Sequence, residues 1–216
     1  MLEKLLQELQ STKTRLIAVS KTKSADAITQ LYNSGQRDFG ENYVQEIVAK
    51  ASCLPADIRW HFIGHLQSNK VKAIAPFVHL IHTLDSLSLL AEIEKQAKKN
   101  NRVVNCLLQF KINEEESKFG LQESDIASFF NSDTYQLCSH VRIIGVMGMS
   151  TFTDDKSKIS AEFRKLKSIF DLLKSKYFYS NSDFSEISMG MSDDYKIAIQ
   201  EGATMVRIGS LLFGKR

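Results

Sequence analysis

The chain has 216 residues, 43% of them hydrophobic, which suits one large domain or two small ones. Its 28 basic and 25 acidic side chains nearly balance, which argues against nucleic-acid binding. No apolar run is long enough to span a bilayer, and the N-terminus lacks the apolar core of a signal peptide. The cysteines Cys53, Cys106 and Cys138 are widely spaced and odd in number, as expected of thiols in a reducing compartment. We therefore expect a cytoplasmic protein that binds neither nucleic acid nor membranes.

Hydrophobic patterning predicts strands and helices that alternate along the chain. An amphipathic helix over 2–10 comes first, and the first strand runs from Arg15 towards Lys21. Further strands are predicted over 37–42, 59–64, 77–84, 103–112, 141–147, 184–189 and 205–213. Helices are predicted over 24–34, 43–51, 68–76, 86–100, 122–130, 156–177 and 192–201. Eight strands are thus expected.

Eight alternating units average about 27 residues each, close to the size of one strand and one helix in a (β/α)8 TIM-type barrel. A doubly wound open sheet is the alternative, but it more often has five or six strands. The chain ends soon after the last predicted strand, so no eighth helix is expected there. The N-terminal helix could cover the resulting gap, because strands one and eight are neighbours in a closed barrel. We predict a single domain over 1–216.

Lys21 stands at the carboxyl end of the apolar first strand. A lysine held in a low-dielectric pocket becomes a neutral nucleophile that forms a Schiff base with an aldehyde or ketone. The alternative is a lysine that reaches from the strand end into solvent. The first strand alone favours this alternative, because lysine is rarely buried without a partner.

The loops after strands seven and eight have the features of an anion site. Ser188 begins a turn of small residues that opens a helix, whose free N–H groups would receive an anion. Gly209 and Ser210 follow strand eight. Either loop alone could be an ordinary helix cap or bend, but neighbouring loops of this kind in a barrel favour an anion site.

Arg207 lies opposite Val206 and Ile208 on strand eight, so it points into the barrel if those residues face the outer helices. A buried arginine needs a partner. Lys21 and Arg207 could then face one ligand whose phosphate rests on Ser188 and Ser210. A ligand that offers an aldehyde, a phosphate and a ring nitrogen is pyridoxal 5′-phosphate (PLP).

Five segments, 18–23, 39–46, 60–70, 186–194 and 205–214, resemble those of the pyridoxal phosphate homeostasis protein family, known as PLPBP, PROSC or YggS-like. The resemblance implies a fold-type III barrel similar to the N-terminal domain of alanine racemase, with PLP held as a Schiff base on Lys21. It also implies that the cofactor site consists of Lys21, Asn42, Ser188, Met189, Gly190, Arg207, Gly209 and Ser210. Position 210 is often threonine in this family, and Ser210 keeps the hydroxyl.

An arginine beside the pyridine nitrogen disfavours its protonation and so weakens the ring as an electron sink. Racemases of similar fold tolerate this arginine, but the resemblance implies that they add a second domain and a tyrosine base. This chain ends at Arg216. We therefore expect a monomeric protein that carries or buffers PLP in vitamin B6 homeostasis, without catalytic residues, and delivers it to PLP-dependent apo-enzymes.

Two other functions stay open at this stage. One is a single-domain amino-acid racemase with Tyr43, His61 or His65 as its base. The other is an aldolase-like barrel in which Lys21 forms a Schiff base with a sugar phosphate and needs no cofactor.

Histidine pairs raise the question of a metal site. His61 and His65, like His79 and His82, have spacings that metals use on helices, but these residues fall on strands and turns without a carboxylate at matching spacing. We therefore predict no metal site, and we expect His79 and His82 to be core residues. The acidic run 114–116 is expected to be a solvated loop that could border the pocket.

Overall fold

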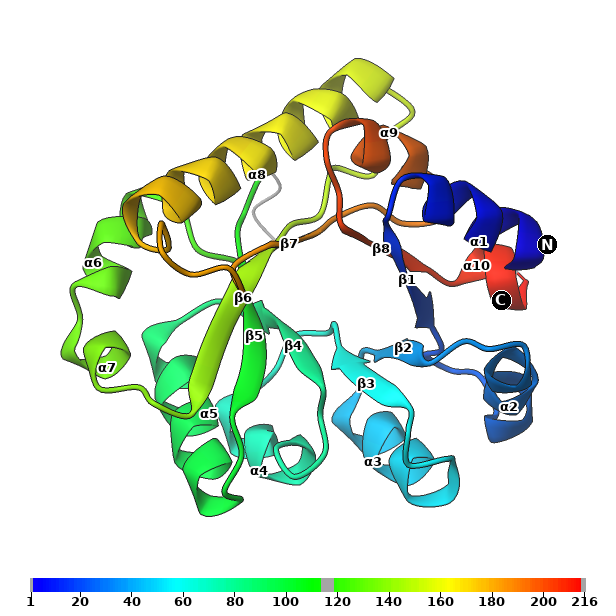
Figure 1. Cartoon of the computed structure of the whole chain (residues 1–216), viewed down its shortest axis with the longest axis horizontal. Coiled ribbons are helices and arrows are strands. Elements are labelled where there is room, and N and C mark those ends of the chain that lie inside the picture. Colours follow the sequence, from blue (N-terminus) through cyan, green and yellow to red (C-terminus); the bar gives the residue numbers. More distant parts are fainter. Residues whose placement is uncertain (1, 114–118, 215–216) are drawn as a thin grey trace.

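The computed structural model describes residues 2–113 and 119–214, and these form a closed barrel of eight parallel strands surrounded by helices (Figure 1). The acidic run 114–116 lies outside the described residues. The strands follow one another around the barrel in chain order. They are β1 (Arg15–Val19), β2 (Asp38–Glu41), β3 (Arg59–Phe62), β4 (Leu80–Leu84), β5 (Val104–Gln109), β6 (Val141–Met147), β7 (Glu186–Ser188) and β8 (Met205–Ile208).

Helices connect successive strands and form the outer layer (Figure 1). They are α1 (Leu2–Ser11), α2 (Ala25–Asn33), α3 (Val44–Cys53), α4 (Val71–Ile74), α5 (Leu87–Lys99), α6 (Ile126–Phe130), α7 (Asp133–Gln136), α8 (Lys156–Lys176), α9 (Tyr195–Gln200) and α10 (Ser210–Phe213). Short 3₁₀ turns, η1 (Ser68–Lys70) and η2 (Glu123–Asp125), precede α4 and α6. No helix among the described residues is both long and apolar enough to cross a membrane.

The strands bury both of their faces. Outward side chains such as Val206 and Ile208 join the large cluster that packs against the helices, to which α8 contributes an apolar stripe. Inward side chains form a smaller cluster inside the barrel, made of Ile17, Leu80, Leu107, Met147 and Met205. Burial on both faces explains why the strands are continuous apolar runs in the sequence.

The barrel closes between β1 and β8, with Ile17 opposite Arg207 and Ala18 opposite Ile208. Helix α1 packs on the core near this seam through Leu5 and Leu9. The Tyr195 hydroxyl on α9 donates to Glu8 of α1 at 3.1 Å. The N-terminal helix thus lies against the last part of the chain.

Several predicted boundaries were wrong. Strand β8 ends at Ile208, and the residues after Gly209 form the one-turn helix α10, whereas we expected a strand to residue 213 and no further helix. The N–H groups of Leu212 and Phe213 both donate to the Gly209 carbonyl, which closes this turn. Strand β7 is shorter than the predicted 184–189, and the fully buried Phe184 lies in the loop before it. Helix α7 was not predicted.

Gly64, after β3, allows a close approach of two backbone segments. A Cβ at this position would lie 2.1 Å from the carbonyl oxygen of Asn42. We expect Gly64→Ala to lower the free energy of unfolding by about 3 kcal/mol, because the backbone must shift. Urea denaturation measures the change. Gly35→Ala is the control, since φ is +95° there but nothing lies within 4 Å, and it should cost only about 1 kcal/mol. Equal losses in both variants would contradict the steric explanation.

Candidate functional site

A pocket of about 300 Å³ opens at the carboxyl ends of β8, β1, β2 and β3. The described residues that line it are Val19, Lys21, Lys23, Asn42, Ile63, Met149, Met191, Ser192, Asp193, Arg207, Gly209, Ser210 and Gly214. Five of the eight predicted site residues are in this lining: Lys21, Asn42, Arg207, Gly209 and Ser210. The structure therefore brings both ends of the chain into one pocket.

Lys21 follows β1 and is positioned through the residues on either side of it. The Thr22 N–H donates to Glu46 Oε2 at 2.7 Å, and Thr22 has a left-handed backbone with φ of 63°. Such a backbone is uncommon for a β-branched residue and persists only where its surroundings hold it. The Ser20 carbonyl accepts a hydrogen bond of 2.8 Å from Lys50 Nζ. Lys21 thus lies on a backbone turn that α3 holds from both sides.

Lys50 is the centre of the polar network that holds this turn. Besides the Ser20 carbonyl, Lys50 Nζ contacts Glu41 Oε1 at 2.7 Å and Glu46 Oε2 at 2.8 Å. Burial raises the pKa of Glu41. Burial would also raise the pKa of Glu46, but hydrogen bonds from Lys50 and the Thr22 N–H outweigh it and lower that pKa. Glu46 is therefore a stable anion beside the buried ammonium of Lys50.

Arg207 points into the barrel, as strand alternation predicts, and its residue is only 4% exposed. One guanidinium nitrogen donates to Ser188 Oγ at 2.7 Å and another donates to the Gly148 carbonyl at 3.0 Å. Burial lowers the pKa of Arg207 to about 10, partly offset by the negative charge of Asp194. Arg207 consequently stays charged at neutral pH.

The predicted turn Ser188, Met189 and Gly190 is buried and is not among the described residues that line the pocket. Gly190 has φ of +90°, and a Cβ there would lie 2.6 Å from Ala198 Cβ, so the turn packs tightly against α9. The residues that follow this turn, 191–193, line the pocket instead. Direct contacts of 188–190 with a ligand stay a prediction.

Asn42 supplies a polar atom to the pocket. Its Oδ1 is buried and has no hydrogen-bond partner among the residues that the structure describes. A buried amide oxygen without a partner costs free energy, so a bound ligand that donates to it would be favoured. Asn42 and Lys21 line the same pocket, and a contact of Asn42 with the cofactor stays a prediction.

Lys23 is a lining residue that the sequence analysis missed. Its Nζ donates to the Phe213 carbonyl at 3.3 Å and lies 6.0 Å from the centre of the Phe213 ring. This contact ties the loop after β1 to the last helix. Lys21 and Thr22 form a turn, so strand alternation gives no signal for the position of Lys23.

Of the residues considered as catalytic bases, Tyr43, His61 and His65 are not among the described lining residues. Tyr43 is 51% exposed. The His65 ring stacks on Phe119 with centroids 3.8 Å apart. His61 is fully buried inside the barrel.

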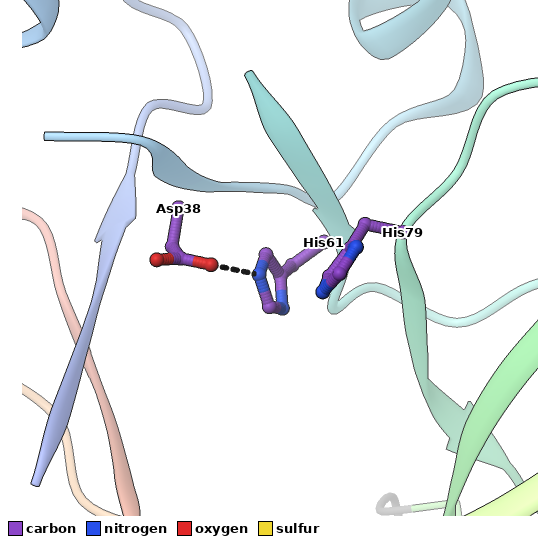
Figure 2. A group of neighbouring side chains, drawn as sticks. All are labelled: Asp38, His61 and His79. Carbon is purple, nitrogen blue, oxygen red and sulfur yellow. Dashed lines mark hydrogen bonds and ion pairs between the residues drawn. The ribbon is translucent and has the colours of Figure 1, made fainter. Parts of the chain in front are cut away.

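The histidines do not form the pairs that their spacing suggested. Asp38, His61 and His79 instead form a cluster whose ligand atoms lie within 4.8 Å of one another (Figure 2). Figure 2 shows the Asp38 carboxylate bonded to His61, with His79 beside the His61 ring. Arg59 already binds Asp38, and both nitrogens of His61 have hydrogen-bond partners in Asp38 and His82. A cation would have to break these bonds, so the geometry does not favour a metal site.

The sequence pattern of the family described as "Alanine racemase, N-terminal domain" matches residues 2–216. A protein of Aquifex aeolicus named pyridoxal phosphate homeostasis protein is 41% identical over 203 residues, which cover 94% of this chain and 87% of that protein. The chain belongs to the pyridoxal phosphate homeostasis protein family. The sequence-based assignment to this family is confirmed.

Solved structures of similar proteins include PipY of Synechococcus elongatus PCC7942 with PLP bound. PipY is 33% identical, with a TM-score of 0.87 over 99% of this chain and 100% of that one. An alanine racemase of Clostridium difficile 630 is only 14% identical, with a TM-score of 0.72 over 100% of this chain and 56% of that one. The predicted similarity in fold between this family and the barrel of alanine racemase is therefore confirmed.

Replacing Lys50 tests the network beneath Lys21. Lys50→Met keeps the aliphatic stem but leaves the buried Glu41 carboxylate without its cation, so we expect a loss of about 3 kcal/mol in the free energy of unfolding. Lys95→Met, which removes an exposed pair with Glu92, should cost less than about 0.5 kcal/mol. Urea denaturation of both variants measures this difference. Wild-type stability in Lys50→Met would contradict the role of Lys50 in holding the turn that carries Lys21.

The Asp38 carboxylate gives a pH-dependent prediction. Burial would raise the pKa of Asp38, but hydrogen bonds from Arg59 and His61 outweigh it and hold that pKa well below its usual range. A carboxyl with a lowered pKa stabilises the fold above its unfolded pKa of about 4, and this contribution is lost as the pH falls below that value. We expect Asp38→Asn to be about 2 kcal/mol less stable than wild type at pH 7. Urea unfolding should show this gap narrowing between pH 5 and pH 3; a constant gap would contradict the assignment.

Proposed function

We propose that this chain binds PLP in the pocket between Lys21 and Arg207 and carries or buffers it for vitamin B6 homeostasis, without catalytic turnover. The observation that carries this proposal is the meeting of an amine, a buried guanidinium and a backbone approach at Gly209 in one pocket. The PLP-bound structure of PipY, over the full length of this chain, supports the same ligand.

The pocket has the chemistry that PLP requires. Its volume of about 300 Å³ lies at the lower end of the range for small-ligand sites. Its described lining contains three basic residues, Lys21, Lys23 and Arg207, against one acid, Asp193. This excess of positive charge favours an anionic phosphate ester.

Each residue would have a separate role. The Lys21 amine would form the covalent link to the aldehyde, and the Asn42 side chain would bond a polar group of the ring. Gly209 and the Ser210 hydroxyl would receive the phosphate, together with the turn that begins at Ser188. A Cβ at Gly209 would lie 3.1 Å from the Val19 carbonyl oxygen, so the glycine lets the end of β8 lie close to β1.

Arg207 supports binding without turnover. Bound PLP supplies an electron sink, which is strongest when its ring nitrogen carries a proton. Arg207 remains a proton donor at neutral pH and is held by Ser188 and Gly148, so it would hydrogen-bond the ring nitrogen without protonating it. The described lining, moreover, contains none of the proposed bases Tyr43, His61 and His65.

We further propose that the protein acts in the cytoplasm as a monomer and a single barrel domain, and that it delivers PLP to PLP-dependent apo-enzymes. The free thiols of Cys53, Cys106 and Cys138 support a reducing compartment.

The absorption spectrum of the purified protein, loaded with PLP and then separated from unbound PLP by gel filtration, tests the binding mode. We expect a visible band that borohydride removes, because reduction destroys the conjugated link between the lysine and the cofactor. Lys21→Ala should lack this band. Lys23→Ala should keep it, because the Lys23 amine donates a hydrogen bond to the Phe213 carbonyl. A wild type that stays colourless would contradict PLP binding and favour a cofactor-free aldolase. Loss of the band only in Lys23→Ala would move the link to that residue.

A further inference from the structure

A chain of hydrogen bonds crosses the interior of the barrel from β2 to β8. His61 Nε2 lies 2.9 Å from Asp38 Oδ1, and His61 Nδ1 lies 2.9 Å from His82 Nε2. His82 Nδ1 lies 2.9 Å from Ser188 Oγ, which Arg207 contacts at 2.7 Å. Apart from these residues, the barrel core contains an apolar cluster of inward side chains. This series of hydrogen bonds therefore connects Asp38 to the pocket through the core.

One end of this chain is fixed as a hydrogen-bond acceptor. Arg59 Nε donates to Asp38 Oδ1 at 2.7 Å, and a second bond joins the guanidinium to the other carboxylate oxygen. Paired in this way, Asp38 is ionised and can only accept. His61 must therefore donate to it from Nε2–H (Figure 2).

The two histidines in this series of hydrogen bonds are neutral. His61 and His82 are fully buried, and burial lowers the pKa of each. The positive charges of Arg15, Arg59 and Arg207 lie nearby and oppose a further positive charge in the core. A neutral imidazole has one donor and one acceptor nitrogen.

These conditions leave one direction for every bond. His61 donates to Asp38 from Nε2, so its Nδ1 accepts from His82 Nε2–H. His82 then accepts at Nδ1 from the Ser188 hydroxyl, and Ser188 Oγ accepts from the Arg207 guanidinium. All donors point from Arg207 towards Asp38, and none of these groups is left unsatisfied.

We propose that four positioning residues act through Arg207, namely Asp38, His61, His82 and Ser188. Because every hydrogen bond among them is donated in the direction of Asp38, the Ser188 oxygen turns a lone pair towards the guanidinium and holds Arg207 at the pocket. This inference rests on the proposed function, because the group that Arg207 serves is PLP. It gives Ser188 a role behind the pocket wall, in keeping with its complete burial.

The first experiment determines the direction of the chain without any cofactor. Long-range ¹H–¹⁵N spectra of the ¹⁵N-histidine-labelled full-length protein, recorded without PLP at pH 7, distinguish the tautomers of each imidazole. Of the five histidines, the variants His65→Gln, His79→Leu, His82→Gln and His140→Gln assign one signal each, and the remaining signal belongs to His61. We expect His61 and His82 to be neutral with hydrogen on Nε2. A charged His61, or a His82 with hydrogen on Nδ1, would overturn the proposal.

The second experiment measures PLP affinity by titration. His82→Leu removes the acceptor for Ser188, and we expect the Kd for PLP to rise about tenfold, the effect of losing one hydrogen bond of typical strength. His82→Gln keeps a donor and an acceptor, and it should restore the affinity to within about twofold of wild type. Unchanged affinity in His82→Leu, or no rescue by His82→Gln, would overturn the positioning role.

His79→Leu is the matched control. The His79 ring lies beside His61, with centroids 5.3 Å apart, but His79 is not part of the series of hydrogen bonds from Arg207 to Asp38. This variant should therefore bind PLP like wild type. A loss equal to that of His82→Leu would show a general effect on the core and overturn the proposal. If wild type binds no PLP, the proposed function fails, while the tautomer spectra still decide the direction of the chain.

Discussion

Pairing between the first and last strands of the barrel is the constraint on which the site depends. Strands β1 and β8 lie side by side in parallel, with Ile17 opposite Arg207. This register places Lys21 and Arg207, from opposite ends of the chain, in one pocket. A closed barrel also satisfies the backbone groups of both strands, so the site forms where the fold is completed.

Two polar networks then hold Lys21 and Arg207, two of the three basic residues in the pocket lining. Lys50 and Glu46 fix the turn that carries Lys21, and Ser188 and Gly148 fix Arg207. Both networks replace water around charged or polar groups that would otherwise be costly to bury. These hydrogen bonds orient the turn of Lys21 and the guanidinium of Arg207 in the structure without a ligand, which reduces the entropy cost of ordering them when PLP binds.

The sequence was sufficient to predict the barrel and the inward position of Arg207. Alternating strands and helices indicate a parallel sheet whose faces are both buried. Strand periodicity then places the Arg207 side chain inside the barrel. The sequence could not predict α10, because the four residues of this helix, three of them apolar, are too short a run to distinguish the period of a helix from that of a strand. Nor could it show that the turn at Ser188 is buried, since this follows from the packing of Gly190 against α9.

The polar networks were also beyond sequence analysis. Lys50 belongs to an amphipathic helix, where a lysine is usually solvated, and only the tertiary contact with Glu41 reveals its burial. His61 pairs in register with Leu80 on the neighbouring strand, and His82 lies two residues further along the same inward face, so the two histidines meet inside the barrel. Spacing along the sequence suggested other pairs. Contacts of this kind depend on strand register, which a single sequence does not specify to one residue.

The central claim is that PLP occupies the pocket through Lys21. Borohydride reduction of the PLP-loaded protein, followed by mass spectrometry of its peptides, tests this claim most directly, because reduction fixes the cofactor on the lysine that holds it. The account predicts one pyridoxyl group, on the peptide that contains Lys21. Labelling spread over exposed lysines, or an unlabelled Lys21 peptide, would contradict it.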